Sequence, residues 1–437
     1  MVKVVKFGGS SLADAEQFKK VRAIVESDSA RRYVVASAPG KRNAEDTKVT
    51  DMLYNCYSKA AKGADIDELF DGIKQRFTEI ISGLGIDFSL DSEFDIIKSA
   101  FIHKAGKDYA ASRGEYLNSK ILAAYLGYDF IDASDVILFN DDGTLNMDGT
   151  NTLLSSILSD HERAVIPGFY GSMPNDTIKT FSRGGSDITG SIVARASRAD
   201  LYENWTDVSG FLMADPRIIE NPLGIDTITY SELRELSYMG AGVLHEDAIF
   251  PVRFAGIPIN IKNTNAPEDK GTFIVPKADK ADPVRVITGI SGKRGFSVLS
   301  IEKDMMNSEI GFGRRVLEVF EKHGISFEHL PSGVDTMCVI VSTPLIADIK
   351  DQIKAEICRA VSPDKISIDD GIALLAVVGR GMVQSKGTAA RVCSAIARAE
   401  INIRMIDQGS SEKSIILGVD ESDLESAMRA VYAEFVK

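Results

Sequence analysis

Short apolar runs alternate with longer amphipathic stretches through the first two-thirds of the chain. The longer stretches have the apolar spacing of helices, and residues 99–127 and 186–199 are clear examples. This alternation predicts an α/β fold in which helices sandwich a mostly parallel sheet. The short runs are rich in β-branched and aromatic residues, as is typical of buried strands, and they lie at residues 2–7, 32–38, 128–134, 163–171, 199–207 and 257–263.

The pattern also divides the chain into regions. Residues 46–122 are almost entirely helical in pattern, and we expect them to form a lobe beside the sheet. A stretch rich in Lys, Asp and Pro at residues 276–283 is typical of a linker. The sequence therefore predicts a first domain at residues 1–275 and a second region at residues 284–437.

The second region contains an internal repeat. Residues 295–370 have the pattern βαββαβ, whereas residues 371–437 have the pattern βαββα and lack the last strand. A strand-like run at residues 284–291 precedes the first unit. Because an open sheet edge is costly to leave unpaired, we expect this run to complete the second unit. The sequence thus predicts two intertwined, ferredoxin-like α/β modules.

Composition narrows the class of protein. Apolar residues make up 44% and the net charge is −13, which argues against a nucleic-acid or anionic-membrane surface. No apolar run approaches the roughly 20 residues needed to cross a bilayer, and the N-terminus lacks a signal-peptide pattern. The four cysteines and five histidines are scattered, so we expect neither a zinc site nor a disulfide framework, and we interpret the chain as cytosolic.

The first strand ends in the motif Lys6-Phe7-Gly8-Gly9-Ser10. A parallel sheet has its active site at the carboxyl ends of its strands, where glycines let backbone N–H groups approach an anion closely. Lysine supplies a compact charge that can follow phosphoryl oxygens through a reaction. A surface turn with a solvated lysine would look similar, and no Walker A or GxGxxG pattern identifies a nucleotide. By itself this motif leaves both interpretations open.

Two further stretches also carry candidate site residues. A second glycine pair lies between Arg183 and Asp187 where a predicted helix begins, so a cation, an anion and hydroxyl groups surround it. This combination is less common than an ordinary helix cap, although Asp187 could also serve as a cap. The strand at residues 199–207 ends in Thr206 and Asp207, whose side chains could face a nucleotide or simply make a turn.

Together, the segments KFGGSS, FSRGGSDITGSIVA and WTDVSGFLMADPR resemble the loops of the aspartate kinase (aspartokinase) family, within the amino acid kinase superfamily. The resemblance covers essentially the whole chain, because that family carries two C-terminal ACT modules with the interleaving described above. Carbamate, acetylglutamate and uridylate kinases share a Gly-Gly opening but not this combination. The resemblance implies transfer of the γ-phosphoryl group of ATP to the β-carboxylate of L-aspartate, with Mg²⁺ arriving with ATP. The product would be 4-phospho-L-aspartate, which leads to lysine, threonine and methionine.

The resemblance also implies roles for individual residues. Lys6 would stabilise the phosphoryl group in flight, and Asp187 would orient the lysine and the loops rather than act as a base. Arg183 would hold a carboxylate of aspartate in a two-pronged salt bridge. The other matching positions are, for ATP, Phe7, Gly8, Gly9, Ser10, Thr206, Asp207 and Arg217, and, for aspartate, Ser37, Thr50 and Glu115.

The implied mechanism needs no general base. The attacking β-carboxylate has an ordinary pKa of about 3.9 and is already ionised at neutral pH. The protein has only to align two anions and stabilise the charge that spreads over the phosphoryl oxygens. Glu115 would meet the amino group of aspartate. The alternative is a solvated glutamate on a helix face, paired with Arg113 or Lys120.

Some positions depart from the family pattern. Thr50 follows a stretch, KRNAEDTK, that is longer than in many relatives. Some relatives place a lysine near the position of Asn265, whereas this chain has Lys262 instead. Glu246 stands where relatives often carry proline. The roles of Lys262 and Glu246 therefore stay open.

The second region implies regulation by an amino acid. Met306, Gly311, Glu328 and Ser332 match positions that bind a feedback amino acid in lysine-sensitive relatives. Lysine is the first choice of effector and threonine the second, although Glu328 could equally be a solvated edge charge. ACT modules pair across subunits in related proteins, so a homodimer or homotetramer is expected.

Two other hypotheses remain open from the sequence. One is a kinase of the same superfamily that acts on a different carboxylate or phosphate. The other is a catalytically silent amino-acid sensor in which only the second region works. Intact Lys6, Arg183 and Asp187 favour an enzyme over the sensor.

Overall fold

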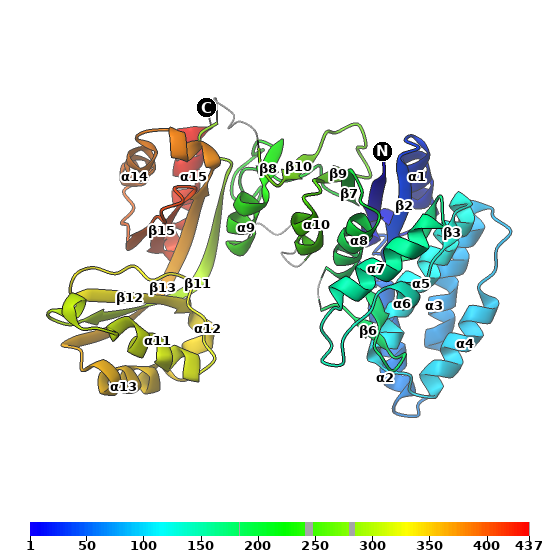
Figure 1. The fold of residues 1–437 in the computed structure, drawn as a ribbon, viewed down its shortest axis with the longest axis horizontal. Coiled ribbons are helices and arrows are strands. Elements are labelled where there is room, and N and C mark those ends of the chain that lie inside the picture. The colour runs from blue at the N-terminus through cyan, green and yellow to red at the C-terminus, as the bar shows by residue number, and fades with distance from the viewer. Residues whose placement is uncertain (183, 241–247, 279–284, 437) are drawn as a thin grey trace. The chain divides into compact units, whose positions relative to one another are not determined.

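The structure is a computed structural model, and it describes residues 1–182, 184–240, 248–278 and 285–436 (Figure 1). The chain divides into two compact units, which are described separately. Unit 2 includes two short segments that precede residue 275, in addition to the C-terminal region. Unit 1 is made of Met1–Phe211, Gly224–Tyr230 and Gly242–Ala278, and unit 2 of Leu212–Leu223, Ser231–Ala241 and Asp279–Lys437.

Unit 1 is built on an eight-stranded sheet. Neighbouring strands run parallel except for β9 and β10, which are antiparallel. The predicted mostly parallel sheet is thus confirmed. In order across the sheet, the strands are β3 (Asp129–Phe130), β4 (Ala164–Pro167), β2 (Arg31–Ala36), β1 (Lys3–Phe7), β7 (Leu201–Thr206), β9 (Ile259–Asn263), β10 (Thr272–Val275) and β8 (Thr227–Thr229).

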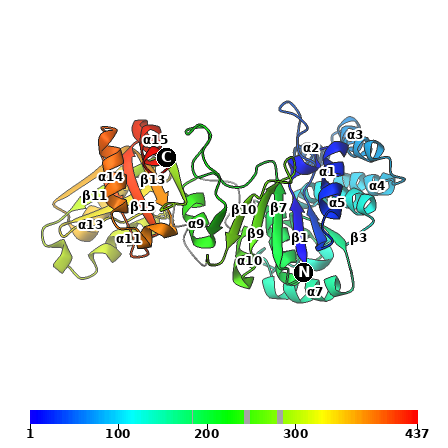
Figure 2. The same cartoon turned by 90° about the horizontal axis from the view of Figure 1, so that it is seen from above.

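Helices cover both faces of this sheet, and Figure 2 shows the two layers. One layer contains α1 (Ala15–Glu26) and α5 (Lys107–Leu126), with the remaining helices of the lobe packed on them, and the other contains α8 (Gly185–Ala196). Val5 and Phe7 of β1 share one apolar core with residues of α1 and α5. The other helices are α2 (Val49–Ala60), α3 (Asp67–Leu84) and α4 (Asp91–Ile102) in the lobe, and α6 (Ala133–Val136), α7 (Met147–Ser159) and α10 (Phe250–Ala255).

Two details of unit 1 differ from the sequence-based expectation. The helical pattern at residues 99–127 is interrupted between α4 and α5, because Lys104 and Gly106 have positive φ angles of 61° and 110°. Strand β10 lies in the polar stretch just before the predicted linker. Thr272 and Ile274 are buried while Phe273 between them is exposed, which is the two-residue period of a strand with one covered face.

Unit 2 contains one five-stranded antiparallel sheet that both modules share. The second half of β11 pairs with β12 and with the first half of β13, while its first residues, 289–293, pair with residues 374–378 of β13. The chain before the first module therefore supplies the missing strand of the second, and the intertwined modules are confirmed. The strand order is β12 (Thr336–Ser342), β11 (Gly289–Glu302), β13 (Lys365–Val378), β15 (Ser414–Asp420) and β14 (Met405–Asp407).

The two long strands cross from one module to the other without a turn. Gly295 in β11 and Gly371 in β13 have positive φ angles of 92° and 73°, so they bend the strands where separate strands were expected. The predicted strand at residues 325–333 is reduced to isolated bridges. The helices of unit 2 are α9 (Tyr230–Tyr238), α11 (Phe312–Lys322), α12 (Thr343–Ile346), α13 (Lys350–Val361), α14 (Thr388–Arg398) and α15 (Leu424–Phe435).

Helix α9 is held in unit 2 by a buried carboxylate. Glu232 is 1% exposed and accepts hydrogen bonds from the Thr288 hydroxyl at 2.6 Å and from the Arg380 guanidinium and backbone N–H, both at 2.9 Å. These bonds explain why residues 231–241 belong to this unit. None of the described helices is both long and apolar enough to cross a bilayer.

Candidate active site

Lys6 lies at the carboxyl end of β1, a strand in the middle of the unit 1 sheet. Its side chain is buried, since the residue is only 7% exposed. The ammonium group lies 2.6 Å from the Asp187 carboxylate and donates to the Asn204 side-chain oxygen at 3.4 Å. The alternative interpretation, a surface turn with a solvated lysine, is therefore wrong.

Asp187 reaches this point from the first turn of α8. Gly184, with a φ of 60°, is the residue before the helix, and no side chain of the described residues caps the first turn. The suggestion that Asp187 caps the helix is therefore wrong, because its carboxylate binds Lys6 and the Asn204 amide instead. Arg183, the predicted carboxylate-binding residue, lies outside the described residues.

The glycines after β1 allow two loops to touch through their backbones. The Gly40 N–H donates to the Gly9 carbonyl at 2.8 Å, and a Cβ atom on Gly40 would lie 2.6 Å from the Gly9 carbonyl carbon. A Cβ atom on Gly9 would lie 2.9 Å from the Ala38 oxygen. Any side chain at either glycine would thus separate the loop after β1 from the loop after β2. Sequence reasoning missed Gly40.

Gly8 and Ser10 occupy different positions in the same loop. The Gly8 N–H donates to the Trp205 carbonyl at 3.0 Å, so Gly8 contributes close approach rather than a free donor. Ser10 is exposed, and Phe7 is buried against the Trp205 ring at a centroid distance of 6.0 Å. Their contacts with ATP stay predictions.

The aspartate-side residues gather around the loop that follows β2. The Ser37 N–H donates to the Phe7 carbonyl at 3.2 Å, which ties this loop to β1. The Asn118 amide of α5 donates to the Ser37 carbonyl at 2.7 Å, a contact that sequence reasoning missed. Thr50 is half-buried in the first turn of α2.

Glu115 faces the same loop from α5. The residue is 6% exposed, and one carboxyl oxygen, Oε2, is buried without a hydrogen-bond partner among the described residues. Burial raises the pKa of its carboxyl from the ordinary 4.5 to about 8, although a hydrogen bond from the Ala38 N–H opposes this. A buried acid that lacks a cationic partner is suited to receive one from a ligand.

The alternative interpretation of Glu115, a solvated glutamate paired with a neighbouring cation, is wrong. Lys120 binds Glu93 at 2.5 Å, and the Arg113 guanidinium lies over the rings of Tyr109 and Tyr116, 4.5 Å from each centroid. Both cations therefore have other partners.

The predicted nucleotide residues lie in both units. Thr206 ends β7, two residues after Asn204, and its hydroxyl donates to the exposed Asp207 carboxylate at 3.1 Å. Arg217 belongs to unit 2, where its exposed guanidinium binds Asp215 at 2.6 Å. The ATP-binding roles of these residues stay predictions.

Lys262 lies on the other face of the sheet from Lys6. The strand register places it beside Trp205, and its ammonium group lies 5.1 Å from the centre of that ring. Burial lowers the pKa of the Lys262 ammonium. Glu246, the other open position, lies outside the described residues.

Arg76 of α3 connects the lobe to the loops of the site. Its buried guanidinium binds Asp46 at 2.5 Å and donates to the Gly40 carbonyl at 3.0 Å and the Ala13 carbonyl at 3.4 Å. Arg42 binds the same Asp46 at 2.9 Å, and both arginines, Arg42 first, hold the pKa of that carboxyl well below its ordinary value. The long stretch after Gly40 is thus fixed by two ion pairs.

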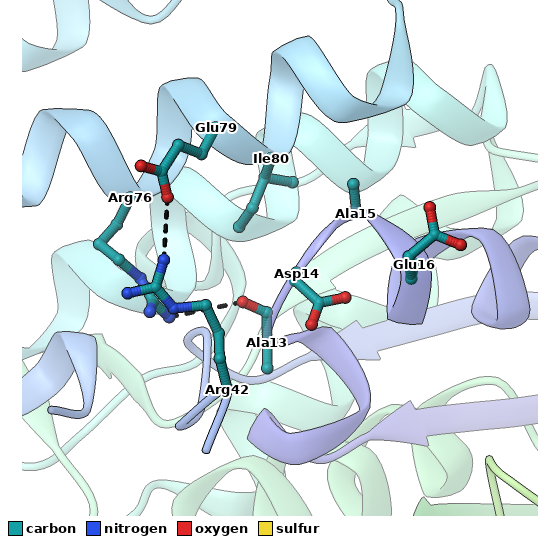
Figure 3. A pocket seen from close by; sticks show the side chains of 8 residues that line it. All are labelled: Ala13, Asp14, Ala15, Glu16, Arg42, Arg76, Glu79 and Ile80. Atoms are coloured by element: carbon teal, nitrogen blue, oxygen red, sulfur yellow. Dashed lines mark hydrogen bonds and ion pairs between the residues drawn. The ribbon is translucent and has the colours of Figure 1, made fainter. Parts of the chain in front are cut away.

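Figure 3 shows one of two hollows beside this network, with a volume of about 260 Å³. The second hollow, about 610 Å³, shares Arg42, Arg76 and Glu79 with it. Neither is lined by Lys6 or Glu115, so both lie beside the candidate site rather than in it.

We expect Arg76→Gln to lower the free energy of unfolding by about 3 kcal/mol, because breaking a buried ion pair leaves buried acceptors unpaired. Arg42→Gln is the matched control, since Arg42 binds the same carboxylate but its side chain is 40% exposed. It should cost less than about 1 kcal/mol. Urea unfolding of both variants measures the difference, and equal losses would contradict the assignment.

The predicted effector residues lie in the first module of unit 2. Met306 is buried in a short 3₁₀ turn, and Gly311 precedes α11 with a φ of 78°. The Glu328 N–H donates to the Ile340 carbonyl at 2.8 Å, and its Oε2 is buried without a partner among the described residues. Ser332 is exposed. Their binding of an effector stays a prediction.

A model of the amino acid kinase family matches residues 1–263, and a model of an ACT domain matches residues 375–435. The chain is 40% identical to aspartokinase 3 of Bacillus subtilis, over 99% of this chain and 98% of that protein.

Solved structures agree in fold. The crystal structure of Clostridium acetobutylicum aspartate kinase matches with a TM-score of 0.89 and 50% identity, over 99% of both chains. Escherichia coli aspartokinase III, solved in complex with aspartate and ADP, matches over the full length of both chains with a TM-score of 0.75. At 23% identity, that second likeness shows the fold alone.

Proposed function

The chain belongs to the amino acid kinase family and is an ATP-dependent kinase, and from that membership we propose that it transfers the γ-phosphoryl group of ATP to the β-carboxylate of L-aspartate. The product would be 4-phospho-L-aspartate. The observation that carries the proposal is the ion pair of the buried Lys6 near the end of β1 with Asp187 in the first turn of α8, together with a buried glutamate, Glu115, that has no cationic partner among the described residues. The names of the aspartokinase relatives support the choice of aspartate.

The residues would divide the chemistry among them. Lys6 would follow the phosphoryl oxygens, while the loops around Gly9 and Gly40 let the backbone approach the phosphates. Arg183 and Glu115 would hold the carboxylate and the ammonium group of aspartate, so its ionised side chain is aligned for attack. Ser37 and Thr50 would complete the amino-acid side of the site.

Mg²⁺ would enter with ATP. Among the described residues, no group of three or more His, Cys, Asp or Glu side chains is placed to hold a metal ion. Phosphate oxygens and water would therefore supply most of its ligands, as Mg²⁺ prefers. The ion would neutralise charge on the phosphates.

The test is the formation of an acyl phosphate that hydroxylamine traps as a hydroxamate. The purified protein with ATP and Mg²⁺ should form it with L-aspartate and not with N-acetylglutamate or carbamate, and ADP release should show no turnover of uridylate, whose phosphorylated product is not an acyl phosphate. Product formation with one of the other acceptors in place of aspartate would overturn the substrate assignment. Absence of turnover with every acceptor would favour the sensor hypothesis.

We also propose feedback by an amino acid at the ACT modules of a homo-oligomer, with lysine as the first choice and threonine as the second. The Oε2 atom of Glu328, which has no partner among the described residues, supports a site for an ammonium group, and Escherichia coli aspartokinase III has been solved with lysine and aspartate. Regulation would require the effector to favour one of two states of the protein. Titrating lysine and threonine separately into the hydroxamate assay tests this, and an unchanged rate with both would contradict it.

A further inference from the structure

Asn204 contacts both charged groups of the candidate site. In the strand register, Asn204 of β7 is the direct neighbour of Lys6 of β1, so both side chains point to the same face of the sheet. Asp187 reaches that face from α8, which packs against both strands. Asn204 is only 4% exposed, so water is excluded from its amide.

Both ends of this amide are used. Its nitrogen donates to Asp187 Oδ1 at 2.9 Å, and its oxygen accepts from Lys6 Nζ at 3.4 Å. The reverse orientation would place the amide oxygen against the carboxylate and the NH₂ group against the ammonium, where both contacts are repulsive. The charges on either side thus determine which way the amide points.

These contacts use only some of the N–H donors of Lys6. Its ammonium group has three N–H donors, and two of them bind Asp187 and Asn204 within the described residues. The third remains for a phosphoryl oxygen. Gly8 lies next to the ammonium group, because a Cβ atom on Gly8 would lie 3.5 Å from Lys6 Nζ. Glycine has no side chain, so it leaves this side of the ammonium group uncovered.

We infer that Asn204 is a positioning residue that holds Lys6 and Asp187 in the arrangement needed for phosphoryl transfer. The inference rests on the proposed function, because it assigns the work of Lys6 to a transferred phosphoryl group. Asn204 acts through Lys6 and Asp187, with which its amide forms hydrogen bonds. A lysine that swings away by about 1 Å stabilises the transition state less, and such misplacement can cost about 10²-fold in rate.

The first test replaces the amide by an apolar group of similar size. In the hydroxamate assay, Asn204→Leu should lower kcat by about 30-fold while KM for aspartate changes by less than about threefold, because the loss is confined to the transition state. Asn260→Leu is the matched control. Asn260 is 5% exposed and lies on β9, and the register places its side chain on the opposite face. Its kcat should stay within about twofold of the parent.

The second test uses pH. Asn204→Asp keeps the oxygen that faces Lys6 but places a second carboxyl group against Asp187, and one of the two must then hold a proton to avoid repulsion. When protonated, the new carboxyl can donate to Asp187 as the amide does. The ratio of kcat in Asn204→Asp to kcat in the parent should therefore rise as the pH falls from 9 to 6.

The outcomes separate the inference from the proposed function. A parent protein that forms no acyl phosphate overturns the proposed function. An active parent with unchanged kcat in Asn204→Leu overturns the inference. So do equal losses in Asn204→Leu and Asn260→Leu, or a pH-independent ratio for Asn204→Asp, because a purely structural role would produce them.

Discussion

Replacing Lys6 with alanine is expected to lower kcat for acyl phosphate formation by about 10³-fold, as loss of a cation aimed at a transferring phosphoryl group does in other kinases. KM for aspartate should change far less, because the ammonium group stabilises charge that develops only in the transition state. The reason lies in its surroundings. The buried ammonium is held 2.6 Å from Asp187, so it needs little reorganisation during the reaction. Steady-state kinetics with hydroxylamine trapping measures the effect.

Two variants make the result specific. Lys6→Arg keeps the positive charge but replaces a compact ammonium by a planar fork, and it should recover less than a tenth of the parental kcat. Lys3→Ala removes a second lysine from the same strand, which binds Asp28 at 2.8 Å and Glu203 at 3.3 Å. Lys3 lies at the far end of β1, so its loss should leave kcat unchanged. A tenfold or smaller effect of Lys6→Ala would contradict the proposed role.

The local pattern of the chain was enough to predict the fold, whereas the family resemblance implied that Asp187 would orient Lys6 in the candidate site. Strand and helix periods predicted the parallel sheet, and motifs at a strand end and a helix start pointed to Lys6 and Asp187. The continuous strand β13 was not predicted, because Gly371 is read as a turn in sequence but bends an unbroken strand in the structure. Where two modules share a sheet, counting a strand end at every glycine therefore predicts too many strands.

The residues that were missed owe their positions to contacts distant in sequence. Asn204 is placed by the pairing of β7 with β1, almost 200 residues away, and nothing in its own strand distinguishes it from a buried polar residue. Arg76 lies on an amphipathic helix where an arginine is usually solvated, yet it is 5% exposed. Gly40 is required because it touches Gly9. Sequence order alone does not reveal such neighbours.

Binding of aspartate is expected to strengthen as the pH rises, because Glu115 must give up its proton to bind an ammonium group. With a pKa of about 8 in the free protein, the carboxyl is about one-tenth ionised at pH 7, so KM for aspartate should fall about eightfold between pH 7.0 and 8.5. Glu115→Gln should abolish this dependence. It should also raise KM at pH 8.5 by about 10²-fold, since an amide cannot pair with the ammonium. Steady-state kinetics across this pH range measures both effects.

The pH dependence of stability provides an independent test of protonation at Glu115. The folded state holds the proton up to about pH 8, whereas the unfolded chain releases it near the ordinary value of 4.5, so the free energy of unfolding contributed by this group falls as the pH rises between those values. Glu115→Gln should therefore gain stability relative to the parent from pH 5 to pH 8 in urea unfolding without ligand. Glu93→Gln is the control, because the pKa of Glu93 lies below its ordinary value despite burial, owing to its bond from Lys120. It should leave the KM trend between pH 7.0 and 8.5 unchanged and should not reproduce the gain in stability from pH 5 to pH 8. A KM slope that survives Glu115→Gln would assign the proton to another group.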